Sequence, residues 1–113
     1  MFPRSLRLKR NNDIGRVLKS GIAIKGKYLI IKIVTNNLPN SRFGFITSLK
    51  VSKKAVIRNK VKRILRDIAR KQAKTFTDHK DILVIALPTC AQATYQQLNI
   101  DLQSCFARIK TLK

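Results

Sequence analysis

The stretch from Ser52 to Phe76 restricts the possible folds of this sequence more than any other stretch does. Its core positions recur at helical spacing and fall on one arc of a helix, at Val61, Ile64, Leu65, Ile68, Gln72 and Phe76. Ser52 can cap such a helix. A helix with one apolar arc has to bury it. The sequence therefore predicts a long helix packed against another layer of the fold.

The opposite side of this predicted helix is almost entirely basic. Asn59, Lys62, Arg63, Arg66 and Arg70 fall within roughly 100° of one another, and Arg58 and Lys60 flank them. Like charges one helical turn apart repel, so a helix kept only for its fold would place acids among them. A solvated basic face is the ordinary interpretation of a charge run. Arginine forks and lysine charges also bind phosphate, and we favour contact with RNA or DNA.

The charge of the whole chain supports this interpretation. It has 113 residues with 25 Lys and Arg against five acids, all Asp, for a net charge of +20. Such an excess destabilises a compact state unless a polyanion compensates it. The length suits a single domain over residues 1–113, in which residues 1–10 form a basic segment that we expect to be flexible.

The remaining elements follow from local signals. Asn11-Asn12-Asp13 begins a short helix that Gly21 ends, and Asp13 is the expected cap. Strands are predicted at 22–24, 28–35, 42–48 and 81–87. Thr94 can cap a last helix whose inner face is Tyr95, Leu98, Leu102, Cys105, Phe106 and Ile109. The order α-β-β-β-α-β-α indicates an α+β fold, a single-domain α-β sandwich.

Residues for catalysis are scarce. The one histidine, His79, follows Asp78 in a predicted loop, and no two carboxylates share a face, whereas a two-metal nuclease needs several at one spot. Cys90 and Cys105 lack metal-site spacing and are expected to be reduced thiols. The apolar stretches are too short to span a bilayer, and no targeting signal is evident. Any nucleolytic chemistry is therefore expected to come from another molecule.

Aromatic side chains on the predicted strands offer a second possible RNA contact. Tyr28, Phe43 and Phe45 could stack on unpaired bases. Packing in the core is the more common role for each of them, and the sequence leaves both open.

The run Lys53-Lys54-Ala55-Val56-Ile57-Arg58-Asn59-Lys60-Val61-Lys62-Arg63-Ile64-Leu65-Arg66 resembles the signature of the bacterial ribonuclease P protein subunit family. The resemblance extends over nearly the whole chain. It includes the opening Phe2-Pro3-Arg4-Ser5-Leu6-Arg7-Leu8, the strand Arg42-Phe43-Gly44-Phe45, the strand Asp81-Ile82-Leu83-Val84-Ile85-Ala86, and Thr94-Tyr95 at the start of the last helix.

The resemblance implies a fold and a function. The fold is like the second domain of ribosomal protein S5, with a left-handed βαβ crossover where the general rule favours the right hand. The family protein is an auxiliary subunit in the bacterial cytoplasm. A catalytic RNA that uses magnesium removes the 5′ leader of precursor tRNA, and the protein binds that RNA and the leader. No small-molecule substrate and no membrane are implied.

Site residues are carried over by position. The resemblance implies contacts with the catalytic RNA at Lys53, Lys54, Arg58, Asn59, Lys60, Lys62, Arg63, Arg66 and Arg70, and a metal contact at Asn59. It implies a leader-binding cleft between the first helix and the sheet, for which the candidates are Ile14, Leu18, Tyr28, Phe43, Phe45 and Lys50. Ile14 and Leu18 stand where the family often has phenylalanines, so apolar contact replaces stacking there. The run 49–53 lacks a lysine and a glycine that are common in the family.

Charge and size alone fit a basic ribosomal or ribosome-assembly RNA-binding protein as the alternative. A self-sufficient metal-dependent nuclease would need more carboxylates than the chain offers.

Overall fold

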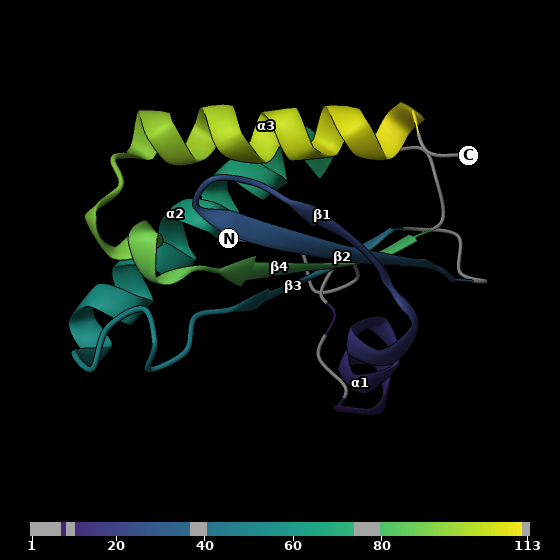
Figure 1. Cartoon of the computed structure of the whole chain (residues 1–113), viewed down its shortest axis with the longest axis horizontal. Coiled ribbons are helices and arrows are strands. Elements are labelled where there is room, and N and C mark those ends of the chain that lie inside the picture. The colour runs from purple at the N-terminus through teal and green to yellow at the C-terminus, as the bar shows by residue number, and fades with distance from the viewer. Residues whose placement is uncertain (1–7, 9–10, 37–40, 74–79, 112–113) are drawn as a thin grey trace.

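The helices and strands follow one another in the predicted order (Figure 1). The computed structural model describes residues 8, 11–36, 41–73 and 80–111. Its elements are α1 (Asn11–Ser20), β1 (Ile22–Lys25), β2 (Leu29–Thr35), β3 (Arg42–Ile46), α2 (Ala55–Ala73), β4 (Lys80–Ala86), the 3-10 helix η2 (Pro88–Gln92) and α3 (Tyr95–Thr111). The sequence did not predict η2, which begins at Pro88 and buries Cys90.

The four strands form one sheet in the order β1-β2-β4-β3. β1 pairs with β2 and β2 with β4 in antiparallel fashion, whereas β3 and β4 are parallel and place Phe43 beside Ile82. α2 connects these two parallel neighbours, which is the βαβ connection that the family resemblance implies. The left hand of that crossover stays a prediction.

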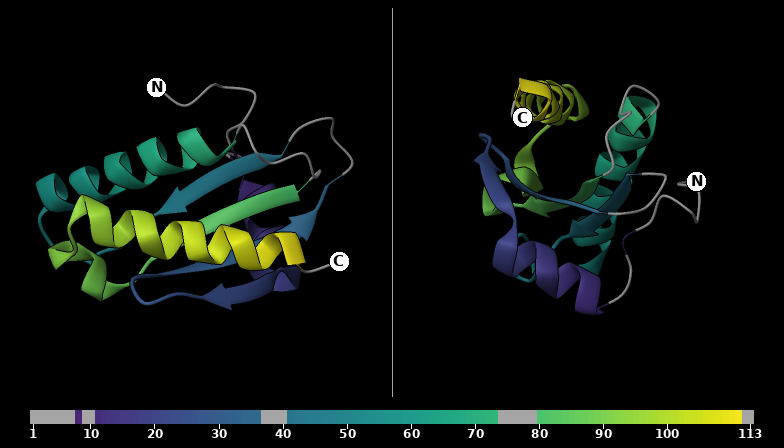
Figure 2. Two further views of the ribbon diagram at one scale, coloured as in Figure 1. Left: turned by 90° about the horizontal axis from the view of Figure 1, so that it is seen from above. Right: turned by 90° about the vertical axis from the view of Figure 1, so that its right-hand side faces the viewer.

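Helices cover both faces of the sheet. α2 and α3 lie on one face, called here the α2/α3 face, and α1 lies on the other, called the α1 face (Figure 2). Successive side chains of a strand point to opposite faces. In β4, Ile82 and Val84 therefore join the core under α2 and α3, whereas Leu83 packs with Val17 of α1. Because this central strand is buried on both sides, its sequence is a continuous apolar run.

The second helix is shorter than the sequence predicts. The Lys54 carbonyl accepts bonds from the amides of Ile57 (3.1 Å) and Arg58 (3.2 Å), so the helix starts just after Lys54. The predicted cap at Ser52 is wrong, because the Ser52 hydroxyl accepts a bond from the Lys54 amide (3.1 Å) in the preceding turn. α2 ends at Ala73, and Phe76 lies outside the described residues.

The first helix ends at Gly21 for a different reason from the expected one. No described glycine has a positive φ angle. Instead, a Cβ at position 21 would lie 2.3 Å from the Val17 carbonyl oxygen and 3.1 Å from that of Ile33. Gly21 is therefore required by close approach of the backbone. Asp13 lies inside the first turn and pairs with Arg42 at 3.2 Å, so its predicted capping role is also wrong.

The last helix begins with the predicted cap. The Thr94 hydroxyl accepts a bond from the Gln97 amide (3.2 Å), and the Gln97 side chain accepts one from the Thr94 amide (2.9 Å), which is a capping box. Leu98, Leu102, Cys105 and Phe106 are buried as predicted. Tyr95 is instead 39% exposed. The side chain of Ile109 is not among those that the structure describes.

Candidate nucleic-acid interface

α2 presents the predicted basic face to the outside. Its buried side chains are Val61, Leu65, Ile68 and Ala69, which pack on the sheet and on α3. The exposed side chains include Asn59, Lys60, Arg63, Arg66 and Arg70. Burial of the apolar arc thus orients the helix, and the cations of the opposite face point away from the core.

The cations of this helix are not equally available to a ligand. Arg58 is half-buried and donates through Nη1 to the carbonyls of Ser52 (2.9 Å) and Lys53 (3.0 Å), so it holds the turn before α2. Arg70 donates to Asp67 at 2.9 Å. Partial burial, together with the charge of Arg66, lowers the pKa of Lys62.

Arg63 and Arg66 are the cations best placed for phosphate. Within the part of the chain that the structure describes, neither pairs with a carboxylate. An exposed guanidinium offers a planar fork that matches two phosphate oxygens. Lys60 is exposed beside them. Contact between this face and RNA stays a prediction at the level of single residues.

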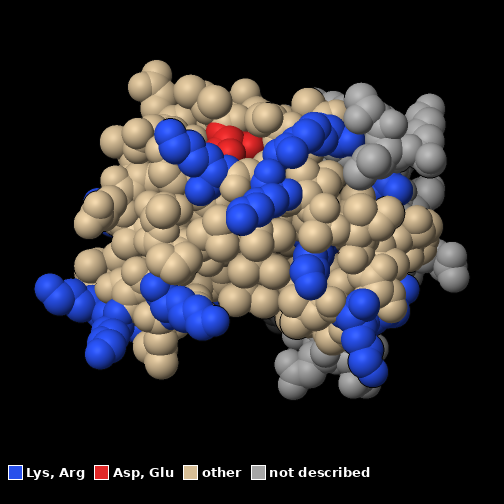
Figure 3. Space-filling view, in the orientation of Figure 1, with Lys and Arg blue, Asp and Glu red and all other residues tan. Residues whose placement is uncertain are grey.

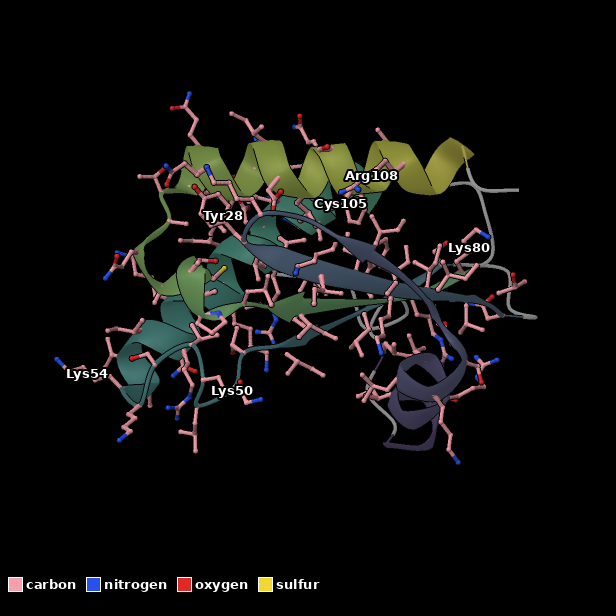
Figure 4. All side chains as sticks on the ribbon, in the orientation of Figure 1. Tyr28, Lys50, Lys54, Lys80, Cys105 and Arg108 are labelled. Carbon is pink, nitrogen blue, oxygen red and sulfur yellow. The ribbon has the colours of Figure 1, made fainter. Side chains whose placement is uncertain are left out.

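The loop between β3 and α2 adds three exposed lysines, Lys50, Lys53 and Lys54. Figure 4 shows Lys50 and Lys54 on this loop, at the end of the molecule away from α1. Figure 3 shows separate groups of Lys and Arg side chains on the face of the molecule that Figure 1 presents, with little acidic surface among them. The basic surface is therefore wider than α2 alone.

A second candidate surface is the α1 face of the sheet. Ile14 is half-buried against Val17 and Leu83, and Leu18 is 40% exposed. These two side chains lie on the helix where the sequence places them. Ile46 and Ile85 of the neighbouring strands pack only partly into the same cluster. This face therefore keeps accessible apolar surface beside α1.

The aromatic residues predicted for the leader cleft lie on the wrong face. Phe43 is 2% exposed in the core under α2 and α3, where its ring meets the edge of Phe106 at a centroid distance of 6.1 Å. Phe45 and Tyr28 pack partly against that same core, and Figure 4 shows Tyr28 close to α3. The prediction that Tyr28, Phe43 and Phe45 line a surface beside α1 is wrong. In β3, Gly44 and Ile46 are the residues that point toward α1.

Lys32 also belongs to the α1 face, although it was not predicted as a site residue. Its Nζ donates to the Leu18 carbonyl at the end of α1 at 3.1 Å, and the side chain is half-buried. A lysine within the apolar run of β2 was the available signal, because a charge in such a strand has to find a partner or solvent. This lysine adds a positive charge beside the apolar residues Ile14 and Leu18.

Each described aspartate ties elements of the fold together. Asp13 binds Arg42, Asp67 binds the Tyr95 hydroxyl (2.7 Å), Asp81 is buried among cations, and Asp101 accepts bonds from the amides of Lys27 (2.9 Å) and Tyr28 (2.8 Å). The described residues contain no group of three or more His, Cys, Asp or Glu able to hold a metal. The described acids therefore connect elements of the fold.

The two thiols are buried, and neither forms a disulfide. Burial, and then the charge of Asp101, raises the pKa of Cys90 to about 11. Burial also raises the pKa of Cys105. Both thiols stay protonated near neutral pH and are poor nucleophiles. None of the helices in the described ranges is both long and apolar enough to cross a membrane.

Comparison with known proteins identifies the family. The family model for ribonuclease P matches residues 2–110. A ribonuclease P protein component from Pseudanabaena sp. (strain PCC 6903) is 37% identical over 113 residues, covering 99% of this chain and 97% of that protein. One from Alkaliphilus metalliredigens (strain QYMF) is 37% identical over 107 residues, covering 94% and 95%.

Solved structures agree with the sequence matches. The RNase P protein of Staphylococcus aureus superposes with a TM-score of 0.84 at 29% identity, covering 96% of this chain and 98% of that one. The RNase P protein of Thermotoga maritima superposes with a TM-score of 0.81 at 25% identity, covering 90% and 96%. Since sequence and fold both match over nearly its whole length, the chain belongs to the ribonuclease P protein family.

Proposed function

We propose that this ribonuclease P protein docks onto the catalytic RNA of the enzyme through the exposed face of α2. The observation that carries the proposal is the placement of Arg63 and Arg66. They lie on the outer side of a helix whose inner side is locked in the core, and no carboxylate in the described ranges pairs with them. Phosphate is the ligand that such forks match. Lys60, Lys53 and Lys54 extend the contact.

The α1 face is the proposed site for the single-stranded 5′ leader of precursor tRNA. Ile14 and Leu18 supply apolar contact for bases, and Lys32 and Lys50 supply charge for the backbone. Stacking on Tyr28, Phe43 or Phe45 is not part of the proposal, because these rings pack on the other face of the sheet.

Cleavage itself is assigned to the RNA subunit. The described aspartates form ion pairs and hydrogen bonds between elements of the fold. The thiols are buried and protonated. The protein therefore contributes binding and orientation. Since precursor tRNA is made in the bacterial cytoplasm, the proposal places the protein there.

Magnesium is the ion that the family resemblance implies, and Asn59 is its candidate ligand on the protein. Asn59 offers one neutral amide oxygen, and its neighbours one turn further along the helix are Lys62 and Arg63. Magnesium prefers several oxygen ligands, with carboxylate or phosphate among them. The donor set at Asn59 does not fit a magnesium site formed by the protein alone. The proposal therefore assigns the ion to the RNA subunit and the substrate.

Reconstitution with the cognate catalytic RNA tests the docking surface. At low magnesium, the wild-type protein is expected to increase cleavage of precursor tRNA, and Arg63→Ala with Arg66→Ala is expected to weaken binding to the catalytic RNA at least about tenfold. Lys25→Ala, an exposed lysine of β1, is the control for loss of a surface cation outside α2. Equal RNA affinity of the double variant and the control would exclude α2 as the docking face.

The leader site has a separate test. Lys32→Ala and Leu18→Ala are expected to weaken binding of precursor tRNA that carries a leader, with little effect on tRNA that lacks one. Loss of affinity for both substrates to the same degree would argue against a leader site on the α1 face.

A basic ribosome-assembly protein, the alternative from charge and size, is not favoured by the family match. It would cosediment with ribosomal particles and leave the catalytic RNA unaffected.

A further inference from the structure

A neutral cluster of four charged residues lies where α1 meets the sheet. Its centre is Asp81, which is 0% exposed at the start of β4. Arg42 of β3 donates two hydrogen bonds to this carboxylate, through Nε (2.8 Å) and Nη2 (2.7 Å). Arg16 of α1 donates a third through Nη2 at 2.7 Å. Asn36 donates at 2.8 Å. Arg42 also reaches Asp13 of α1 at 3.2 Å, so two cations meet two anions.

α1 buries little apolar surface of its own. Among residues 13–20 of α1, whose side chains the structure describes, Val17 is the one buried side chain. By contrast, α2 and α3 each bury four apolar side chains. A helix with so little buried apolar area depends on its polar contacts for its position. Both ion pairs that the described residues form between α1 and the sheet belong to this cluster.

We propose that Asp81, with Arg42 and Arg16, is a positioning centre that holds α1 beside the sheet, and that binding of substrate RNA on the α1 face depends on it. The substrate part of this inference rests on the proposed function. Ile14 and Leu18 lie on the same helix as Arg16, and the end of that helix is capped by Lys32. Any loosening of α1 therefore displaces Ile14 and Leu18 and disturbs the bond between Lys32 and the Leu18 carbonyl. Arg16 and Asp81 act through α1 and need not touch the RNA.

The choice of variant follows from burial. Asp81→Asn would remove the buried carboxylate that Arg42 and Arg16 share, and it is expected to destabilise the chain severely. Arg16 is 43% exposed, so Arg16→Gln removes one of the two ion pairs between α1 and the sheet and leaves the Arg42 bonds to Asp81 and Asp13 intact. Lys19→Gln is the matched control, because it removes the same charge from the same helix without touching Asp81.

Hydrogen exchange on the free full-length protein tests the positioning role. Arg16→Gln is expected to raise the exchange rates of α1 amides about fivefold or more, with no change in α2 or α3. Lys19→Gln is expected to leave them unchanged. Equal α1 exchange in wild type and Arg16→Gln would overturn the inference.

Binding to the assembled enzyme tests the consequence for substrate. Relative to Lys19→Gln, Arg16→Gln is expected to weaken binding of leader-bearing precursor tRNA about threefold or more, while affinity for the catalytic RNA stays the same. The salt dependence distinguishes positioning from direct contact. If Arg16 itself bound a phosphate, Arg16→Gln would reduce the slope of log affinity against log salt by about 0.7, and that result would overturn the positioning role.

The two proposals can fail separately. If the wild-type protein does not aid the catalytic RNA, the proposed function and the substrate role fall together. The exchange experiment still decides the positioning role in that case, because it needs only the free protein.

Discussion

Gly26 and Asp101 form a tie between the β1–β2 turn and α3. A Cβ at position 26 would lie 2.6 and 2.7 Å from the two carboxylate oxygens of Asp101. Those oxygens accept the amide bonds of Lys27 and Tyr28. The turn approaches α3 so closely that a Cβ at position 26 would push the Asp101 carboxylate away from its two amide partners.

Gly26→Ala is therefore expected to displace the Asp101 carboxylate and to lower the free energy of unfolding by ~1–3 kcal/mol. Urea unfolding measures this decrease. Gly15→Ala is the control, because a Cβ at position 15 meets nothing within 4 Å. At an exposed helix position, alanine stabilises the fold by ~0.5–1 kcal/mol relative to glycine. If both variants shift stability in the same direction, the close contact at Gly26 is not the cause.

Two aspartates make the fold sensitive to acid. The hydrogen bond from Tyr95, followed by that from Arg70, lowers the pKa of Asp67 to about 2. Burial by itself would raise the pKa of Asp81, but the bonds from Arg42 and Asn36 and the charges of Arg42 and Arg16 outweigh it and lower that pKa. A carboxyl group whose folded pKa is below its unfolded value stabilises the fold only while it is ionised.

The unfolding free energy is therefore expected to be constant near neutral pH and to fall as the pH drops below the unfolded value of about 4 toward 2. Urea midpoints measured between these limits check the slope. Asp67→Asn removes one contribution, so its curve should be flatter than that of the wild type. Parallel curves for the two proteins would contradict the assignment for Asp67.

At the scale of the element, α2 divides its arginines between structure and binding. Arg58 holds two carbonyls of the preceding turn, whereas Arg63 is exposed without a described carboxylate partner. The two residues are similar in sequence, since both sit in one basic run. Their roles differ because Arg58 faces the turn and Arg63 faces outward.

Arg58→Ala is thus expected to lower the free energy of unfolding by ~1 kcal/mol, whereas Arg63→Ala should stay within about 0.5 kcal/mol of the wild type. Arg63→Ala should instead reduce affinity for the catalytic RNA. Thermal melts and RNA titrations of both variants make the comparison. A larger decrease in stability for Arg63→Ala than for Arg58→Ala would reverse the assigned roles.

At the scale of the whole molecule, the net charge is strongly positive. The chain carries a net charge of +20, and its described acids are each bonded to other groups of the chain. The surplus cations repel one another in the free protein, and RNA relieves that repulsion. A polyanion that binds the folded state and not the unfolded state also raises the apparent stability of the protein.

Salt is therefore expected to have two opposite effects. It should raise the melting temperature of the free protein by screening repulsion. It should weaken RNA binding, by about 10³–10⁵ between 50 and 200 mM if roughly 6–10 phosphates are neutralised. Melting curves and RNA titrations across this range check both effects. An RNA affinity that does not respond to salt would count against the basic surface as the contact.

The sequence by itself determined the elements and the outward face of α2. Helical periodicity separates the buried Val61, Leu65 and Ile68 from the exposed Arg63 and Arg66, and both sets lie where the pattern predicts. The capping box at Thr94 and the buried character of β4 were also readable, because these signals depend on neighbours a few residues away. The family signature lies in the same local pattern.

The tertiary structure alone decided which strand face meets which helix. Alternation shows that Phe43 and Phe45 share one face and Gly44 and Ile46 the other, but it does not say which helix covers each face. That choice depends on packing between residues distant in the chain, and it turned the aromatics away from α1. For the same reason the side-chain partners of Asp81, which come from α1, β3 and the residue after β2, were not predictable from sequence.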